Sequence, residues 1–230
     1  MKNAFVAVLF LAAFGAVSSV GYGSVLVYGF GNPNASPPAL QAVGASSFAV
    51  TNTGITLTAY GFDASNSAKL LEWKAQGGDE NGLGFTDTLD NEITLSSRDQ
   101  PANYIQVDVS QALAAGGLSG MIEAGSVTAG EAFDVWGSNT LGVLGTNIIS
   151  ANTTDNAFIS IPSWGLYNYI AITVHPQLSP SGLDPNNYTP QYNDNVLLSA
   201  VEFTKSSVPE PATMSLLALG GLATLLRRKA

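Results

Sequence analysis

The residues best suited to chemistry lie in an acidic, glycine-rich stretch at positions 77–92. Its oxygen-bearing side chains are Asp79, Glu80, Asn81, Asp87, Asp90, Asn91 and Glu92. Calcium takes about six to eight oxygen ligands and accepts backbone carbonyls, which glycine-rich loops supply readily. The spacing matches no EF-hand, and a second oxygen-rich stretch at 184–195 would complete a site if the fold joined the two. We therefore predict a structural calcium site, with a solvated turn between strands as the alternative. Its ligands would be Asp79, Glu80, Asp90 and Glu92.

Aromatic residues beside polar side chains form a second group, and they predict sugar binding. An aromatic ring stacks on the face of a pyranose, while amide and carboxylate side chains bond the sugar hydroxyls. Two such combinations stand at the ends of expected strands, Trp136 with Asn139 and Trp164 with Tyr167. Large aromatics also supply much of the buried area of a sandwich, so core packing is the alternative for each tryptophan.

Catalytic constellations are sparse. His175 is the single histidine and precedes a proline at the end of an expected strand, a poor frame for a Ser–His relay. One histidine and no cysteine leave no conventional zinc site and no thiol nucleophile. Paired carboxylates for glycoside hydrolysis remain open, with Glu72, Glu92, Glu123 and Glu131 as the residues that could form such a pair. We expect a non-catalytic protein that requires no cofactor, with calcium as the one candidate ion. The alternative is a glycosidase or lyase on a jelly-roll scaffold.

The last 23 residues carry three features in series: Pro209-Glu210-Pro211, an apolar run over 212–226, and the basic cluster Arg227-Arg228-Lys229. At 1.5 Å per residue the run spans about 22 Å, short of the roughly 30 Å hydrocarbon core of a bilayer. The cations would stay on the cytoplasmic side of the membrane. This tail resembles the PEP-CTERM sorting signal. The resemblance implies recognition and removal by a membrane-embedded protease of the exosortase type, in bacteria that make extracellular polysaccharide.

The amino-terminal residues predict a secretory signal peptide over 1–23. Lys2 precedes an apolar run from Ala4 to Val17, and small residues follow, with cleavage expected between Ala16 and Gly23. The protein would therefore cross the inner membrane through the secretion machinery and be held transiently by its C-terminal helix, residues 208–230 forming the sorting signal. After processing it would reside at the cell surface or in the extracellular matrix.

The central part, residues 24–207, is strongly acidic and free of cysteine. It holds four cations against sixteen carboxylates, because Glu210 is the seventeenth, so its net charge is −12. Such a surface repels the phosphate backbone, which excludes nucleic acid as a partner. Without disulfides the fold must rest on its apolar core.

The central part reads as an all-β, antiparallel sandwich of the jelly-roll type. Runs rich in β-branched and aromatic residues alternate with polar turns such as 77–82 and 137–139, and one helical stretch is expected at 110–115. In several runs apolar and polar residues alternate, so one face of each sheet should meet the core and the other water. The expected strands are 24–30, 55–60, 93–95, 104–109, 132–136, 157–161, 167–174 and 196–203.

Short motifs in the central part also look like the domains that often accompany PEP-CTERM tails. They are Gly54–Ala59, Asn81–Gly84, Asp90–Ile93, Gly130–Val135 and Asn195–Leu198. The resemblance implies a β-sandwich of unassigned activity. We therefore expect an exported, non-catalytic surface or matrix protein that associates with extracellular polysaccharide.

Overall fold

The computed structural model describes residues 23–31, 41–76, 80–88, 91–94, 103–127, 131–175 and 195–206. Residues Gly23–Ser206 form one compact unit made of two antiparallel sheets, which confirms the predicted sandwich. The predicted signal peptide and sorting tail lie outside the described residues. No helix in the described part of the chain is long and apolar enough to cross a membrane.

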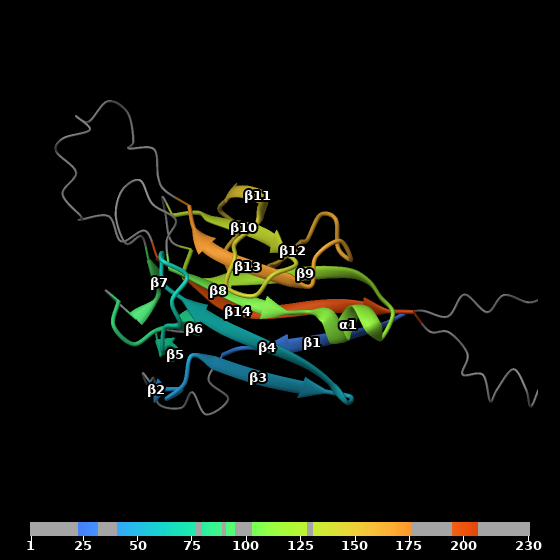
Figure 1. Cartoon of the computed structure of the whole chain (residues 1–230), viewed down its shortest axis with the longest axis horizontal. Helices are drawn as coiled ribbons and strands as arrows, with labels where there is room; N and C mark the ends of the chain where they lie inside the picture. The colour runs from blue at the N-terminus through green and yellow to red at the C-terminus, as the bar shows by residue number, and fades with distance from the viewer. Residues whose placement is uncertain are drawn as a thin grey trace, which may run out of the picture. The chain divides into compact units, whose positions relative to one another are not determined.

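The six-stranded sheet runs in the order β11-β10-β13-β8-β4-β3, from top to bottom in Figure 1. Every neighbouring pair is antiparallel, and β3 and β4 form a hairpin. The strands are β3 (Ser47–Asn52), β4 (Ile55–Phe62), β8 (Tyr104–Asp108), β10 (Phe133–Ser138), β11 (Thr146–Asn152) and β13 (Tyr169–Val174).

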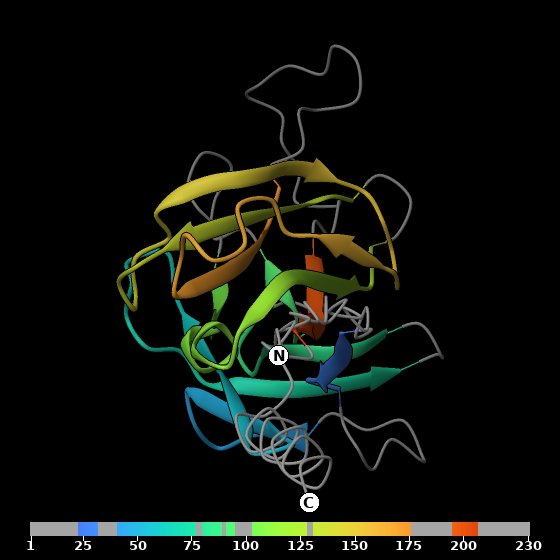
Figure 2. The ribbon, with the colours of Figure 1, turned by 90° about the vertical axis from the view of Figure 1, so that its right-hand side faces the viewer.

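The eight-stranded sheet is built around its longest strand, β14 (Asn195–Lys205). β14 pairs with β9 along most of its length and with β1 over its second half, where the blue and red strands lie side by side in Figures 1 and 2. The other strands are β1 (Ser24–Gly29), β2 (Gln41–Ala42), β5 (Leu71–Gln76), β6 (Glu80–Phe85), β7 (Ile93–Thr94), β9 (Gly117–Gly125) and β12 (Phe158–Ser160).

The chain passes repeatedly from one sheet to the other. β4 belongs to the six-stranded sheet and β5 to the eight-stranded one. Later in the chain, the six-stranded sheet receives β8, β10 and β13, and the eight-stranded sheet receives β9, β12 and β14. β10 and β11 form a hairpin within the six-stranded sheet. These crossings are the jelly-roll-like feature of the fold. They bring segments that are distant in sequence into register on one face.

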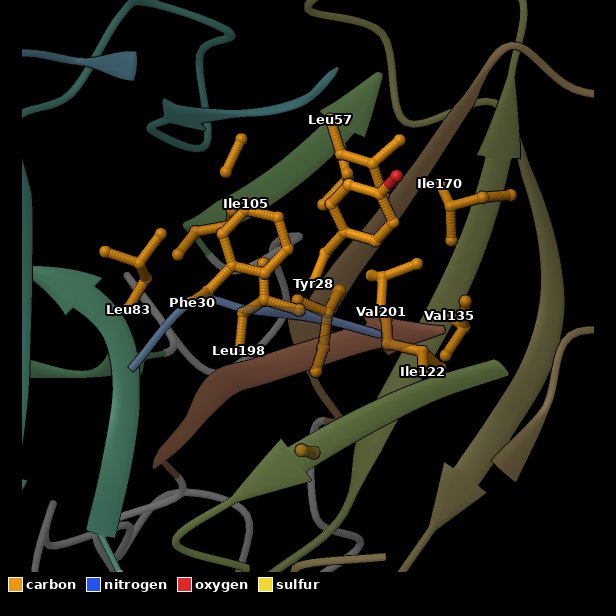
Figure 3. Packing of buried hydrophobic residues seen from close by; sticks show 14 of the residues in the cluster. Tyr28, Phe30, Leu57, Leu83, Ile105, Ile122, Val135, Ile170, Leu198 and Val201 are labelled. Carbon is orange, nitrogen blue, oxygen red and sulfur yellow. The ribbon is translucent and has the colours of Figure 1, made fainter. Parts of the chain in front are cut away.

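A continuous apolar core fills the space between the sheets. Tyr28 of β1 stacks on Phe203 of β14 with ring centroids 5.7 Å apart, and both side chains are fully buried. Figure 3 shows Leu57, Ile105 and Ile170 of one sheet facing Leu198 and Val201 of the other. Each such side chain contributes about 1.5–3 kcal/mol when buried. This core supports the fold in a chain that has no cysteine.

The eight predicted strand regions are all observed as strands, and the predicted helix is α1 (Ser110–Ala114). Its first free amide, Ser110 N–H, donates to Asp108 Oδ1 at 2.9 Å. The two predicted turns are shorter than expected, because β6 already begins at Glu80 and β10 continues through Ser138. The strands β2, β3, β5, β6, β9 and β11 were not among the predicted regions. In β3, β9 and β11, polar residues or glycine interrupt the apolar residues, which weakens the strand pattern.

The prediction that one face of each sheet is exposed to water also fails for the middle of the six-stranded sheet. Tyr104 and Gln106 of β8 are fully buried on the face that points away from the core, as are Ala171 and Thr173 of β13. The Phe62 ring stacks on Tyr104 with centroids 5.2 Å apart, and the loop 139–145 folds over Gln106. Gln106 Nε2 donates to Val143 O at 3.0 Å, and Gly142 N–H donates to Gln106 Oε1 at 2.8 Å.

Candidate functional site

Two of the four predicted calcium ligands, Glu80 and Glu92, converge on the ammonium group of Lys74. Lys74 Nζ contacts Glu92 Oε1 and lies 2.8 Å from Glu80 Oε2. Ser126 Oγ donates to the same Glu92 oxygen at 3.0 Å. Lys74 and Glu92 are both fully buried, whereas the Glu80 side chain is 31% exposed. A lysine therefore supplies positive charge where the sequence predicted a metal ion.

Backbone packing explains how Glu92 reaches Lys74. Lys74 and Gly82 are paired across the β5–β6 hairpin, and Gly84 follows on the same face. A Cβ atom at Gly84 would lie 2.1 Å from Asn91 O and 2.7 Å from Glu92 Cα. Glycine at this position lets the segment that carries Glu92 lie directly on the hairpin.

The other two predicted ligands, Asp79 and Asp90, lie outside the described residues. Within the described ranges no group of three or more His, Asp or Glu side chains is arranged to hold a metal ion. Calcium binding stays a prediction.

The predicted sugar-binding residues Trp164 and Tyr167 pack inward. The Trp164 ring stacks near Phe203 with centroids 6.4 Å apart, and its Nε1–H donates to Gly117 O at 3.2 Å. A Cβ at Gly120 would lie 2.0 Å from the Trp164 ring, and one at Gly137 would lie 2.3 Å from the Tyr167 ring. These glycines make room for the two rings, which are therefore part of the packing of the sandwich.

Asn139 is exposed, but its amide links two loops. Its Nδ2 donates to Leu166 O at 3.2 Å, and its Oδ1 accepts the Asn168 N–H at 3.0 Å. The structure thus joins Asn139 to the 164–168 loop, whereas the sequence analysis had grouped Asn139 with Trp136. The contact is a structural brace between the loop after β10 and the loop before β13.

Unlike Trp164 and Tyr167, which pack inward, Trp136 lies on the outer face of the six-stranded sheet. In register across that face stand Trp136 of β10, Ala171 of β13, Gln106 of β8 and Tyr60 of β4. Trp136 and Leu144 pack against the small apolar cluster of this face. Trp136 Nε1 is buried and has no hydrogen-bond partner among the described residues. Tyr60 packs against the same cluster as Trp136 and Leu144.

Beside the loop 139–145 lies a patch that the sequence did not indicate, which we call the outer tyrosine patch: Thr58, Tyr60, Asp108 and Tyr169. Tyr169, Asp108 and Thr58 are direct register partners on adjacent strands, and Tyr60 is two residues along from Thr58. All four are partly exposed. Burial, Asp108 and Tyr60 together raise the pKa of Tyr169. Two phenol rings thus flank one carboxylate.

Side chains of this type can hold a sugar. Tyrosine offers a rigid apolar face with a polar tip, at low cost in side-chain entropy. The only sequence signal was the position of Asp108 on the polar side of an alternating strand. The two tyrosines could not be assigned to it, because they come from strands more than 40 residues away on either side.

Of the four carboxylates that could serve hydrolysis, Glu92 contacts Lys74 and Ser126, and Glu123 lies near Asp155. Burial and Asp155 raise the pKa of Glu123. Asp155 in turn accepts the Val127 N–H at 2.9 Å through Oδ1 and the Asn156 Nδ2 at 2.9 Å through Oδ2.

The single histidine, His175, is held by a carboxylate. Its Nδ1 lies 2.8 Å from Asp134 Oδ1, and the same oxygen accepts the Ala151 N–H at 2.8 Å. This arrangement ties the end of β13 to β10 and β11.

Comparison with known families assigns the tail. Residues 207–229 match the PEP-CTERM protein-sorting motif. No curated protein and no solved structure matches the chain. The motif implies processing by an exosortase, a membrane-associated partner, and thus export and membrane-associated sorting before surface display. The chain therefore carries a PEP-CTERM motif at residues 207–229, which supports an exosortase-sorted extracellular protein, and its described part is a β-sandwich.

Proposed function

We propose that the sandwich is a non-catalytic module that associates with extracellular polysaccharide at the cell surface or in the matrix. The observation that carries this proposal is the outer tyrosine patch. Its two rings, Tyr60 and Tyr169, lie on one sheet face with Asp108 between them. Rigid strands fix these side chains, so binding a sugar requires little ordering of the protein.

The patch suits an extended polymer better than a small molecule. It lies on the open face of a sheet, with the loop 139–145 beside it and two exposed apolar side chains, Leu141 and Val143, on that loop. A polymer laid across the strands would meet the rings in succession. Weak contacts repeated along a chain give useful overall affinity, because each further contact is intramolecular.

A glycosidase is the alternative, and it would need two carboxylates roughly 5–9.5 Å apart across the substrate. Among the candidate carboxylates, Glu92 is already paired with Lys74 and accepts a hydrogen bond from Ser126. These contacts favour a structural use for this group. They support binding over hydrolysis.

The test uses the mature protein purified from its native host, examined by affinity electrophoresis in gels that contain the host's own exopolysaccharide. We expect wild-type protein to be retarded and the double variant Y60A/Y169A to migrate freely. The matched control is Phe158→Ala, which removes a partly exposed ring from β12 of the other sheet. Thr58→Arg, which fills the patch without removing a ring, guards against misfolding as the cause. Equal retardation of wild type and both patch variants would overturn the proposal.

A further inference from the structure

We infer that the outer tyrosine patch selects polysaccharides that carry protonated amino sugars, with Asp108 as the partner of the sugar ammonium group. This inference rests on the proposed function and names the class of polymer. It follows from the orientation and hydrogen bonding of the Asp108 carboxylate and from the distribution of charge on the sandwich.

The Asp108 carboxylate is held in place with one oxygen still available. Its Oδ1 accepts the Ser110 N–H at 2.9 Å, which fixes the orientation of the group at the start of α1. Its Oδ2 has no hydrogen-bond partner among the described residues. Tyr169 is the direct register partner of Asp108 on β13, and Thr58 is its partner on β4. An oriented, half-buried carboxylate beside aromatic rings suits an ammonium group, which gains an ion pair and a cation–π contact together.

Positive charge is absent from this face in the described part of the chain. The Lys69 ammonium pairs with Asp87 and lies 5.5 Å from the centre of the Phe85 ring. Lys74 is buried between two carboxylates, and Lys205 ends β14 in the other sheet.

The charge of the whole central part acts in the same direction. At −12 it repels uronate and sulfate groups, whereas it attracts a polymer of amino sugars. Neutral sugars would gain only the stacking contacts. The electrostatic complement of the patch is therefore a cationic glycan.

The experiment compares two probes that differ mainly in charge, the β-1,4-linked hexamers of glucosamine and of N-acetylglucosamine. Binding to the mature protein is measured by isothermal titration calorimetry at pH 6 and low salt. We expect the glucosamine hexamer to bind more tightly, by roughly two- to fivefold for each ammonium that reaches Asp108, because exposed ion pairs contribute modestly. The preference should fall with added salt and at pH 8.5, where the sugar amines lose their protons.

Two isosteric variants separate specific recognition from attraction of any polycation by an acidic protein. Asp108→Asn should abolish the preference for the glucosamine hexamer and leave binding of the N-acetylated hexamer unchanged. The control Glu202→Gln removes one partly exposed carboxylate from β14 of the other sheet and should leave the preference intact.

The outcomes also separate this inference from the proposed function. Equal loss of preference in both variants, or a preference untouched by D108N, would overturn the inference. If the N-acetylated hexamer binds as tightly as the glucosamine hexamer and Y60A/Y169A still abolishes binding, the inference fails while the polysaccharide module stands. If neither hexamer nor the host polysaccharide depends on the two tyrosines, both fail.

Discussion

Replacing Lys74 with methionine tests whether the buried lysine cluster determines the stability of the sandwich. Met keeps most of the volume of the side chain and removes its charge. Glu92 would then be left fully buried without its ammonium partner. Removing one member of a buried ion pair costs about 3–5 kcal/mol. Glu80 is 31% exposed and stays hydrated, so its loss adds less than about 1 kcal/mol. The expected total loss is a large fraction of the free energy of unfolding of a typical domain, which is about 5–15 kcal/mol.

The assay is urea unfolding at pH 7, followed by intrinsic fluorescence and far-ultraviolet circular dichroism. The matched control is Lys69→Met, because Lys69 pairs with an Asp87 side chain that is 67% exposed, and that loss should stay below about 1 kcal/mol. The double variant K74M/E92L removes both charges and should regain most of the lost stability, because an apolar pair no longer carries a desolvation penalty.

The dependence on pH gives a second check. In K74M, burial favours the protonated form of the Glu92 carboxyl, so the deficit should shrink as the pH falls from 7 to 4. The reasoning is refuted if K74M loses no more stability than K69M. It is equally refuted if K74M/E92L is as unstable as K74M alone.

Three further predictions follow from single side chains. Burial raises the pKa of Glu123 above its ordinary 4.5, so the native state binds this proton more tightly than the unfolded state and stability falls as the pH rises through that pKa. Glu123→Gln should therefore be more stable than wild type at pH 7, with the advantage vanishing below about pH 4.5 in urea titrations. Burial raises the pKa of Tyr104 from 10.0 to about 12, so wild type should lose stability between these pH values, and Tyr104→Phe should lose less in unfolding at pH 9 and 11.5. Gly120→Ala should displace the Trp164 ring, seen as a red-shifted fluorescence spectrum and a lower melting temperature, while Gly29→Ala, with no atom within 4 Å of the new Cβ, should leave the spectrum unchanged.

The fold could be predicted from the sequence because its strongest strands alternate clearly. In β4, Ile55 and Leu57 face the core while Thr56 and Thr58 are partly exposed, as the sequence pattern requires. The weaker strands could not be predicted, because they are held in the sheet by pairing with neighbouring strands and not by their own strand propensity. β9 has the sequence GLSGMIEAG and is held between β14 and β12, so tertiary pairing overrides a low strand propensity.

The candidate sites were only half predictable. Glu80 and Glu92, which the sequence grouped as calcium ligands, do lie close together, but on Lys74. The sequence did contain a signal for this lysine, because Lys74 stands mid-strand between two apolar residues, close to the acidic stretch. The aromatic sites were harder, because the register of four strands decides which rings share a face. Spacing along the chain cannot reveal that Tyr60 and Tyr169 flank Asp108.

Gln106 connects the stability of the sandwich with its proposed binding face. It is a fully buried polar residue whose amide accepts and donates hydrogen bonds to the loop 139–145, so that loop is fixed over the outer face of the six-stranded sheet. Opening the loop would leave the buried Gln106 amide without these hydrogen bonds. An unsatisfied buried amide costs about 1–3 kcal/mol, so the closed position of the loop is favoured. The loop packs on the apolar cluster of Phe62, Tyr104 and Ala171, and Tyr60 of the outer tyrosine patch packs against the same cluster while staying partly exposed. The same face thus serves folding and presents partly exposed residues to a ligand.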